Sequence, residues 1–181
     1  MLTNADDAKN FKLLVAPILE NHDPEQLVWR ELIPHDRLVK LTTVIPFEKH
    51  IAVTQRKDGL PQIQIMNATT YESHFIQFPE PAYSCHTSNN LYAITLRIIT
   101  VALPLEAHLT MAACREFHTD VLRIRYHSFI TPESTFDYNM TTRELKLLKE
   151  KEVLGGYDRT LYHSERYPYL TSNDIDIDIF L

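Results

Sequence analysis

The residues that could do chemistry in this chain are its serines, its nine histidines and its carboxylates, and their spacing decides which reactions are open to it. An activated serine on a nucleophile elbow needs the pattern G-x-S-x-G, because the sharp turn that exposes the hydroxyl leaves no room for larger side chains. The glycines are Gly59, Gly155 and Gly156, and none of them flanks a serine. The sequence therefore contains neither a nucleophile elbow nor a glycine-rich phosphate loop, and we assign no catalytic residue.

The histidines and carboxylates do not form a recognisable metal site. No H-E-x-x-H motif occurs, and no two histidines have helical ligand spacing with a carboxylate between them. Asp174, Asp176 and Asp178 alternate in "NDIDIDIF", which would place three carboxylates on one face of a strand. A calcium loop also needs a glycine at its sixth position and a glutamate at its twelfth, and both are absent. We interpret these aspartates as a solvated strand face and expect no metal, no cofactor and no cofactor-binding residue.

Composition and charge are those of a globular protein. With 181 residues, 44% hydrophobic and 23% charged, the chain fits one domain or part of a larger one. Its formal net charge is −6 and its Lys and Arg residues are scattered, which argues against a nucleic-acid partner because phosphate binding needs clustered basic charge. Cys85 and Cys114 give no disulfide framework, and the N-terminus lacks the pattern of a secretory signal. We therefore expect a cytoplasmic protein with reduced thiols.

Alternation of apolar and polar residues predicts strands along most of the chain. "HIAVTQ" and "LPQIQIMN" alternate on either side of "RKDG", and Asp58-Gly59 suits the positive φ angles of a tight hairpin. Further strands are predicted for "SHFIQF", "VLRIRYHSF", "STFDYNM", "LKLLKE", "FKLLVAPI" and "QLVWREL". The fold class predicted from this pattern is all-β.

Some of these pieces recur. The polar turns "MNATTYE" and "YNMTTRE" stand between similar strands about 72 residues apart, whereas the strands "FKLLVAP" and "QIQIMNA" lie about 51 apart. Repeats of about 40–50 residues with four strands each are typical of β-propeller blades. The longer spacing exceeds the shorter by nearly the length of the apolar stretch Leu91 to Cys114. We interpret the excess as an insertion that interrupts one of the blades. The alternative is that the segments are four-stranded meanders that are not related as repeats.

The spacings predict a partial β-propeller of about two to three four-stranded blades. The predicted parts are a blade remnant at about 1–37, a full blade at about 38–79 and an interrupted last blade at about 80–155. The apolar part of the insertion, around 91–114, is the one segment with helical periodicity.

That apolar part is also about as long as a membrane span. Arg97, Pro104, Glu106 and His108 interrupt it, and a charge at the centre of a span costs about 2.5–3.5 kcal/mol. We therefore expect no membrane partner. The alternative is a β domain anchored in a membrane by this stretch, and the four interrupting residues argue against it.

Five stretches share a pattern with one known family. They are "NADDAKNFKLL", "LIPH", "RKDGLPQIQI", "TPESTFDYNMTTRELKLLKEKEVLGGYD" and "YHSER". They resemble the propeller of the prolyl oligopeptidase family of serine peptidases, and the nearest branch is oligopeptidase B. In that family a segment like "LLK…VLGGYD" ends the last blade, and a segment like "YHSER" begins the strand that leads into the catalytic domain. The resemblance covers roughly residues 1–83 and 115–167.

The resemblance implies a seven-bladed propeller that caps an α/β-hydrolase domain, which carries a Ser, Asp and His triad. In this branch it also implies cleavage of short peptides after Arg or Lys. No residue of this sequence matches a triad motif, so none is carried over. The family pattern fails near residues 84–114 and after Tyr169. The resemblance therefore implies a partial propeller over residues 1–167, an atypical insertion at 84–114, and a divergent tail at 168–181 where a catalytic domain would begin. We therefore expect a propeller fragment from a partial or mis-assembled gene product, inactive alone, that meets peptide substrates only when joined to a catalytic domain.

An alternative function is that of a non-enzymatic β-meander that binds another protein. Partial blades leave open strand edges, and open edges pair readily with another chain. Such a module could complete itself by oligomerising or by clasping a peptide. Self-association through these edges is therefore an expected partner contact.

Overall fold

The computed structural model describes residues 1–17, 27–88, 116–170 and 176–180. Within these ranges every regular element is a β-strand except for the short 3-10 helix η2, Arg159–Leu161. The all-β fold class and the partial propeller predicted from the sequence are confirmed. The apolar stretch around 91–114 lies outside the described residues, and no helix in the described part is long and apolar enough to cross a membrane.

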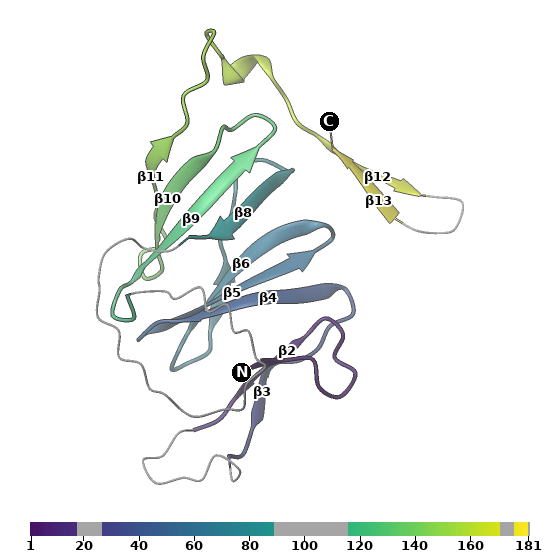
Figure 1. The fold of residues 1–181 in the computed structure, drawn as a ribbon, viewed down its shortest axis with the longest axis vertical. Helices are drawn as coiled ribbons and strands as arrows, with labels where there is room; N and C mark the ends of the chain where they lie inside the picture. Colours follow the sequence, from purple (N-terminus) through teal and green to yellow (C-terminus); the bar gives the residue numbers. More distant parts are fainter. Residues whose placement is uncertain (18–26, 89–115, 171–175, 181) are drawn as a thin grey trace, which may run out of the picture.

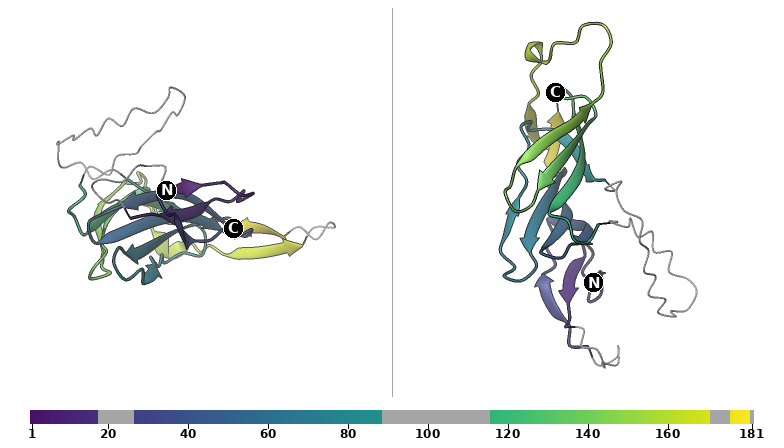
Figure 2. Two further views of the ribbon diagram at one scale, coloured as in Figure 1. Left: turned by 90° about the horizontal axis from the view of Figure 1, so that it is seen from below. Right: turned by 90° about the vertical axis from the view of Figure 1, so that its left-hand side faces the viewer.

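Three antiparallel sheets follow one another along the long axis of the molecule (Figures 1 and 2). The first sheet contains β1 (Leu2–Thr3), β2 (Lys12–Val15) and β3 (Arg30–Ile33). The middle sheet contains β4 (Val39–Pro46), β5 (His50–Lys57), β6 (Leu60–Asn67) and β7 (Ser73–Phe75). The last sheet contains β8 (Tyr83–Thr87), β9 (Val121–Ser128), β10 (Ser134–Asn139) and β11 (Leu145–Glu150). The middle and last sheets are thus four-stranded meanders, as in propeller blades.

A two-stranded hairpin of β12 (Arg166–Leu170) and β13 (Asp176–Phe180) stands apart from the three sheets and projects to one side in Figure 1. Asp176 and Asp178 belong to β13, whereas Asp174 lies outside the described residues.

The hairpin between β5 and β6 has the tight turn that its sequence predicts. Asp58 and Gly59 both have positive φ, at 49° and 76°, and the strands pair directly from Lys57 to Leu60. Two successive left-handed residues match the right-handed twist of the flanking strands, which is why Asp-Gly is favoured there.

The two similar polar turns have the same structure. The side chains of Asn67 and Asn139 each accept hydrogen bonds from the backbone N–H groups two and three residues later, at 2.8–3.0 Å. The residue four positions later, Tyr71 or Arg143, has a φ of 61° or 63° and donates its N–H to the carbonyl of the asparagine. The sequence repeat is therefore a structural repeat, with asparagine as its local turn former.

Most of the core lies between the middle and last sheets. Alternate residues of their strands point inward, and Ile63 and Ile124 are completely buried. Tyr126 stacks on Phe78 with ring centroids 5.1 Å apart. A smaller cluster of Leu13, Leu41 and Val53 joins the first sheet to the middle one. Apolar burial therefore holds adjacent sheets face to face.

Two boundaries differ from the sequence-based expectation. Residues 84–87, which were expected in the insertion, pair with β9 as part of β8, with Ser84 opposite His127. This short strand has only one fully buried side chain, Cys85, so its alternation is weak in the sequence. The last strand ends at Glu150, as the predicted strand "LKLLKE" does, whereas the family pattern places the end of the last blade at "VLGGYD"; here the glycine pair lies after the strand, in the exit segment, residues 151–165.

Candidate functional site

The exit segment returns to the end of the sheets that holds the β5–β6 and β9–β10 turns. Gly155 and Gly156 have φ angles of 100° and 77°, and a Cβ at either would meet nothing within 4 Å. Glycine is therefore required by the backbone conformation and not by lack of space. Tyr157 then donates its hydroxyl to the carbonyl of Ile130 at 2.5 Å, which holds the segment against the last sheet.

Two arginines extend this attachment. Arg159 forms an ion pair with Glu150 at 2.5 Å, next to the end of β11. Arg166 donates to the backbone carbonyl of Asp58, in the tight turn of the middle sheet. The exit segment and the start of β12 thus contact both complete sheets at one end, which we call the exit end.

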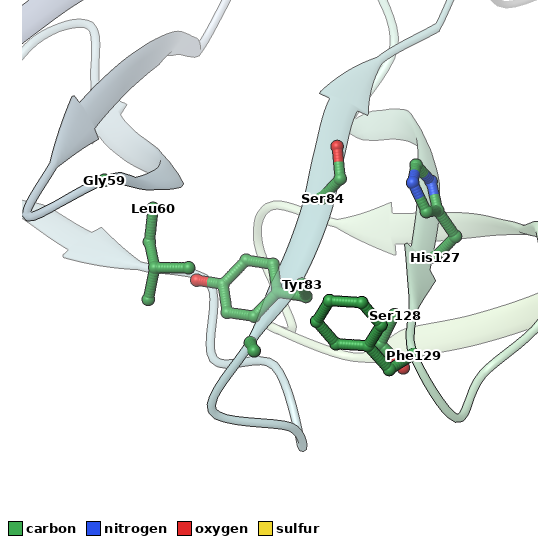
Figure 3. Close-up of a pocket in the computed structure, with 8 residues that line it drawn as sticks. Gly59, Leu60, Tyr83, Ser84, His127, Ser128 and Phe129 are labelled. Carbon is green, nitrogen blue, oxygen red and sulfur yellow. The ribbon is translucent and has the colours of Figure 1, made fainter. Parts of the chain in front are cut away.

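A cleft of about 250 Å³ opens at the exit end between the middle and last sheets (Figure 3). Its lining comes from the β5–β6 turn, from β8 and the residue before it, and from the end of β9 with the residue after it: Gly59, Leu60, Ala82, Tyr83, Ser84, His127, Ser128 and Phe129. In Figure 3 the ring of Tyr83 points toward Leu60, while Ser84 and His127 stand on neighbouring strands. The walls are mainly apolar, with a few hydroxyls and one imidazole.

The side chains of this cleft are suited to binding and not to nucleophilic attack. Ser84 and His127 are cross-strand partners, but among the described residues no hydrogen bond joins them and no carboxylate contacts His127. The Ser128 hydroxyl accepts the N–H groups of Ile130 and Thr131 and so belongs to the turn. A catalytic triad needs a serine, a base and a group that orients the base. The cleft has no such set.

Tyr83 is the main aromatic wall of the cleft. Burial raises the pKa of its phenol to about 12, so it stays a neutral hydrogen-bond donor at physiological pH. Cys85, two residues further along the same face of β8, is a buried thiol whose pKa is likewise raised to about 12 by burial, which makes it a poor nucleophile. Cys114 lies outside the described residues.

The opposite end of the two complete sheets has a hollow of about 220 Å³, whose lining includes His50, His74 and Arg143. The Nε2 atom of His74 lies 2.8 Å from the Tyr138 hydroxyl. Burial lowers the pKa of both histidines. In the part of the chain that the structure describes, no three His, Cys, Asp or Glu side chains gather closely enough to hold a metal ion.

Sequence reasoning missed the exit-end cleft. Tyr83 and His127 are far apart in the chain and come together through the register of β8 with β9. No local motif marks them, and β8 itself was expected to lie mostly in the insertion. The aromatic residue at the start of β8 is the one signal that a careful reading could have used.

Comparison with known proteins identifies the architecture. Residues 1–151 match the family model for the prolyl oligopeptidase N-terminal β-propeller domain. Dipeptidyl aminopeptidase BI of Pseudoxanthomonas mexicana is 29% identical over 164 residues, which cover 91% of this chain and 19% of that protein. Protease 2 of Moraxella lacunata is 27% identical over 166 residues, covering 92% of this chain and 19% of that protein. The chain thus spans about a fifth of the length of these relatives.

Solved structures agree on the fold. Oligopeptidase B from Leishmania major superposes with a TM-score of 0.72 at 22% identity, over 99% of this chain and 22% of that one. Oligopeptidase B from Trypanosoma brucei, in a closed form with covalently bound antipain, gives a TM-score of 0.67 at 21% identity over the same shares of the two chains. At this level of identity the likeness establishes the arrangement of strands alone.

Proposed function

Since the chain belongs to the prolyl oligopeptidase family and matches its N-terminal β-propeller domain, we propose that it serves as part of the propeller of an oligopeptidase B-like serine peptidase. In this proposal the propeller covers the active site and the peptidase cleaves short peptides after Arg or Lys. The blades supply shape and contacts, and another domain supplies the nucleophile. The 181-residue chain by itself is then inactive.

The contacts at the exit end are the observation that best supports this proposal. The exit segment and Arg166 fasten the chain to both complete sheets, through the carbonyls of Ile130 and Asp58. A following domain would therefore start from a fixed point beside the cleft. Rigid attachment matters for a cap, because a propeller that swings freely cannot exclude large substrates.

The chemistry of the cleft supports a binding role at that end. An apolar wall with a few hydroxyls is the usual composition of a surface that receives a side chain or a neighbouring domain. Phe129 in the cleft wall is 69% exposed, and Leu154 and Leu161 of the exit segment are 87% and 78% exposed. Apolar side chains grouped at one end of a molecule are typical of an interaction surface.

Active-site labelling tests the proposal. A fluorophosphonate reacts with an activated serine whatever the substrate, so it reports a hidden triad directly. We expect no labelling of the isolated chain under conditions in which a purified oligopeptidase B is labelled to completion. Labelling of a single serine in this chain, lost after heat denaturation, would place the nucleophile here and overturn the proposal.

The second candidate is the non-enzymatic β-meander that binds another protein. The observation in its favour is β11, the edge strand of the last sheet, where Leu147 and Leu148 are 49% and 44% exposed. An exposed edge strand offers its backbone groups to another strand. Sedimentation velocity separates the two candidates, because a defined monomer or oligomer favours the module and polydisperse aggregation favours a propeller part that needs its neighbours.

A further inference from the structure

The hollow of about 220 Å³ at the end opposite the exit end is a polar site that the proposed function does not use. Seven of its nine lining residues are polar or charged, so it suits a polar ligand. They are His50, Asn67, Glu72, Ser73, His74, Thr141 and Arg143. The middle sheet forms one wall and the turn after β10 forms the other. Because these two sheets pack directly on each other, no further blade can come between the walls.

Strand register brings the two histidines onto one face of the middle sheet. His50 is level with Asn67, and His74 is level with Ile65, on either side of β6. Asn67 and Ile65 are two residues apart on β6, so their side chains point to the same side of the sheet. That side faces the last sheet, because His74 contacts Tyr138 there. The two imidazoles therefore face the hollow from β5 and β7.

His50 has an incomplete set of hydrogen bonds. It is 8% exposed, and its buried Nδ1 has no hydrogen-bond partner among the described residues. The Asp120 carboxylate lies 3.8 Å from Nδ1, close enough for an ion pair but too far for a hydrogen bond. Asp120 can therefore stabilise a proton on His50. The other ring nitrogen, Nε2, is left for a ligand in the hollow, and such a ligand would explain an imidazole that lacks partners.

Further donors surround the same space. The Nε2 atom of His74 is occupied by the Tyr138 hydroxyl, which leaves Nδ1. The side-chain oxygen of Asn67 accepts two backbone N–H groups, which leaves its amide nitrogen to donate to a ligand. From the opposite wall come the hydroxyl of Thr141 and the guanidinium of Arg143, and neither has a partner in the described ranges. Donors thus reach the hollow from both sheets.

The full charges at the hollow cancel when its histidines are neutral. Arg143 brings a positive charge and Glu72 a negative one, and both side chains are at the exposed mouth. Lys49 and Asp120, beside the first histidine, form an ion pair of their own at 3.6 Å. Burial lowers the pKa of both histidines, and the charge of Arg143 lowers the pKa of His74 further. A proton taken up by either histidine therefore gives the hollow a net positive charge.

We propose that this hollow binds a tetrahedral oxyanion, a phosphate or sulfate group, and takes up a proton on its histidines as it does so. A tetrahedral group presents oxygens on every side, which suits donors from two facing walls, whereas a carboxylate accepts mainly within one plane. Imidazolium and guanidinium groups form the short, charge-assisted hydrogen bonds that favour such oxygens. The inference goes beyond the proposed function, because the site lies at the end away from the exit-end cleft.

The proposal has a definite sign with pH. A bound anion stabilises the imidazolium form of each histidine and so raises its pKa. Because binding then takes up protons, the affinity for the anion rises as the pH falls.

Histidine titration by NMR tests this on the whole chain. The ring signals are followed between about pH 5 and pH 8 in sulfate and in chloride at equal ionic strength. Sulfate remains a dianion throughout this range, so any difference reports on the protons of the protein. We expect sulfate to raise the apparent pKa of His50 and of His74 by about 0.5 or more. The ring signals of His163, whose side chain is 79% exposed, should titrate alike in the two salts.

Two variants at the mouth of the hollow should act in opposite directions. R143Q removes the positive charge and should weaken sulfate binding at about pH 6 by about fivefold or more, measured by calorimetry. E72Q removes the opposing carboxylate and should strengthen that binding by about twofold or more. R37Q removes an exposed arginine from elsewhere and should change it by less than about 1.5-fold. Circular dichroism confirms that the three variants fold.

Inorganic phosphate and phenyl phosphate, compared at the same pH, distinguish a free ion from the end group of a larger molecule, because tighter binding of the ester indicates the larger molecule. Acetate is the carboxylate control. Equal titration of His50 and His74 in sulfate and in chloride would overturn the proposal. So would undiminished sulfate binding in R143Q, weaker binding in E72Q, or acetate bound as tightly as phosphate.

Discussion

The Nε2 atom of His74 lies 2.8 Å from the hydroxyl of Tyr138, a hydrogen bond between residues 64 apart in the sequence. It joins β7, the edge strand of the middle sheet, to β10 of the last sheet. Tyr138 is 4% exposed and His74 is half-buried, so water cannot easily replace either partner. The two complete sheets are thus joined by a specific polar contact as well as by their apolar core.

Replacing Tyr138 with phenylalanine should weaken this joint. The change keeps the ring in the core and removes only the hydroxyl, leaving His74 without its partner. We expect the free energy of unfolding to fall by about 1–2 kcal/mol, measured by urea denaturation. Y162F is the matched control, because Tyr162 is 57% exposed, and its stability should stay within about 0.5 kcal/mol of the parent.

Buried His50 and half-buried His74, which line the same hollow, predict a dependence of stability on pH. Burial is the main cause that lowers the pKa of His50 and of His74 below the ordinary value of 6.5; for His50, the Asp120 carboxylate opposes the shift in part. The unfolded chain then binds protons more readily than the folded one as the pH falls. The contribution of the two neutral histidines to the free energy of unfolding is therefore fully present above about pH 6.5. It is lost as the pH drops from there through the lowered pKa values of the folded state.

Urea titrations at several pH values between about 7 and 5 measure this effect. We expect the free energy of unfolding to fall toward the acid end of that range in the parent, and to fall less steeply in H50Q/H74Q. His163 is exposed, at 79% of its side chain, so H163Q should keep the slope of the parent. An unchanged slope in H50Q/H74Q would assign the acid sensitivity to other groups.

The repeated turns can be tested with a matched pair of variants. N67A and N139A each remove a side chain that accepts two backbone N–H groups. Because the two turns have the same geometry, we expect similar losses of about 1 kcal/mol in thermal or urea unfolding. The exposed Asn4 provides a control in N4A. A loss at one turn only would show that the two turns do not stabilise their sheets equally.

Gly59 and Gly156 have nearly the same φ, 76° and 77°, in very different surroundings. An alanine at either position costs about 1 kcal/mol for the left-handed conformation. In G59A this cost should appear in global unfolding, since the turn joins two central strands. In G156A global stability should change little, while hydrogen exchange of the Tyr157 amide becomes faster. Equal global losses would mean that the exit segment unfolds together with the sheets.

The sequence predicted the strands and repeats well, because those depend on local signals. The turn at Asp58-Gly59 and the two asparagine turns are specified by residues within a few positions. It predicted β8 poorly, because a short strand with one buried cysteine has little alternation. The family pattern placed the end of the last blade at the glycine pair, whereas pairing with β10 stops at Glu150, where the predicted strand "LKLLKE" also ends.

The candidate sites could not be predicted from the sequence, for a different reason. Histidines that look scattered in the sequence, such as His50 and His74, share a face because of the register across β6. Likewise, the cleft at the exit end brings Leu60 together with Phe129 only after two sheets have stacked. Such arrangements depend on pairing between distant segments, which the period of a single strand does not encode.

The most direct test of the proposed function is the hydrolysis of a fluorogenic peptide with arginine at the cleaved bond, incubated with the purified 181-residue chain. In the proposed function these blades shape and cover a site whose nucleophile lies in another domain. We therefore expect no turnover above that of buffer at any chain concentration, while an oligopeptidase B assayed in parallel turns the peptide over. Turnover that scales with the concentration of this chain and stops with a serine-directed inhibitor would contradict it.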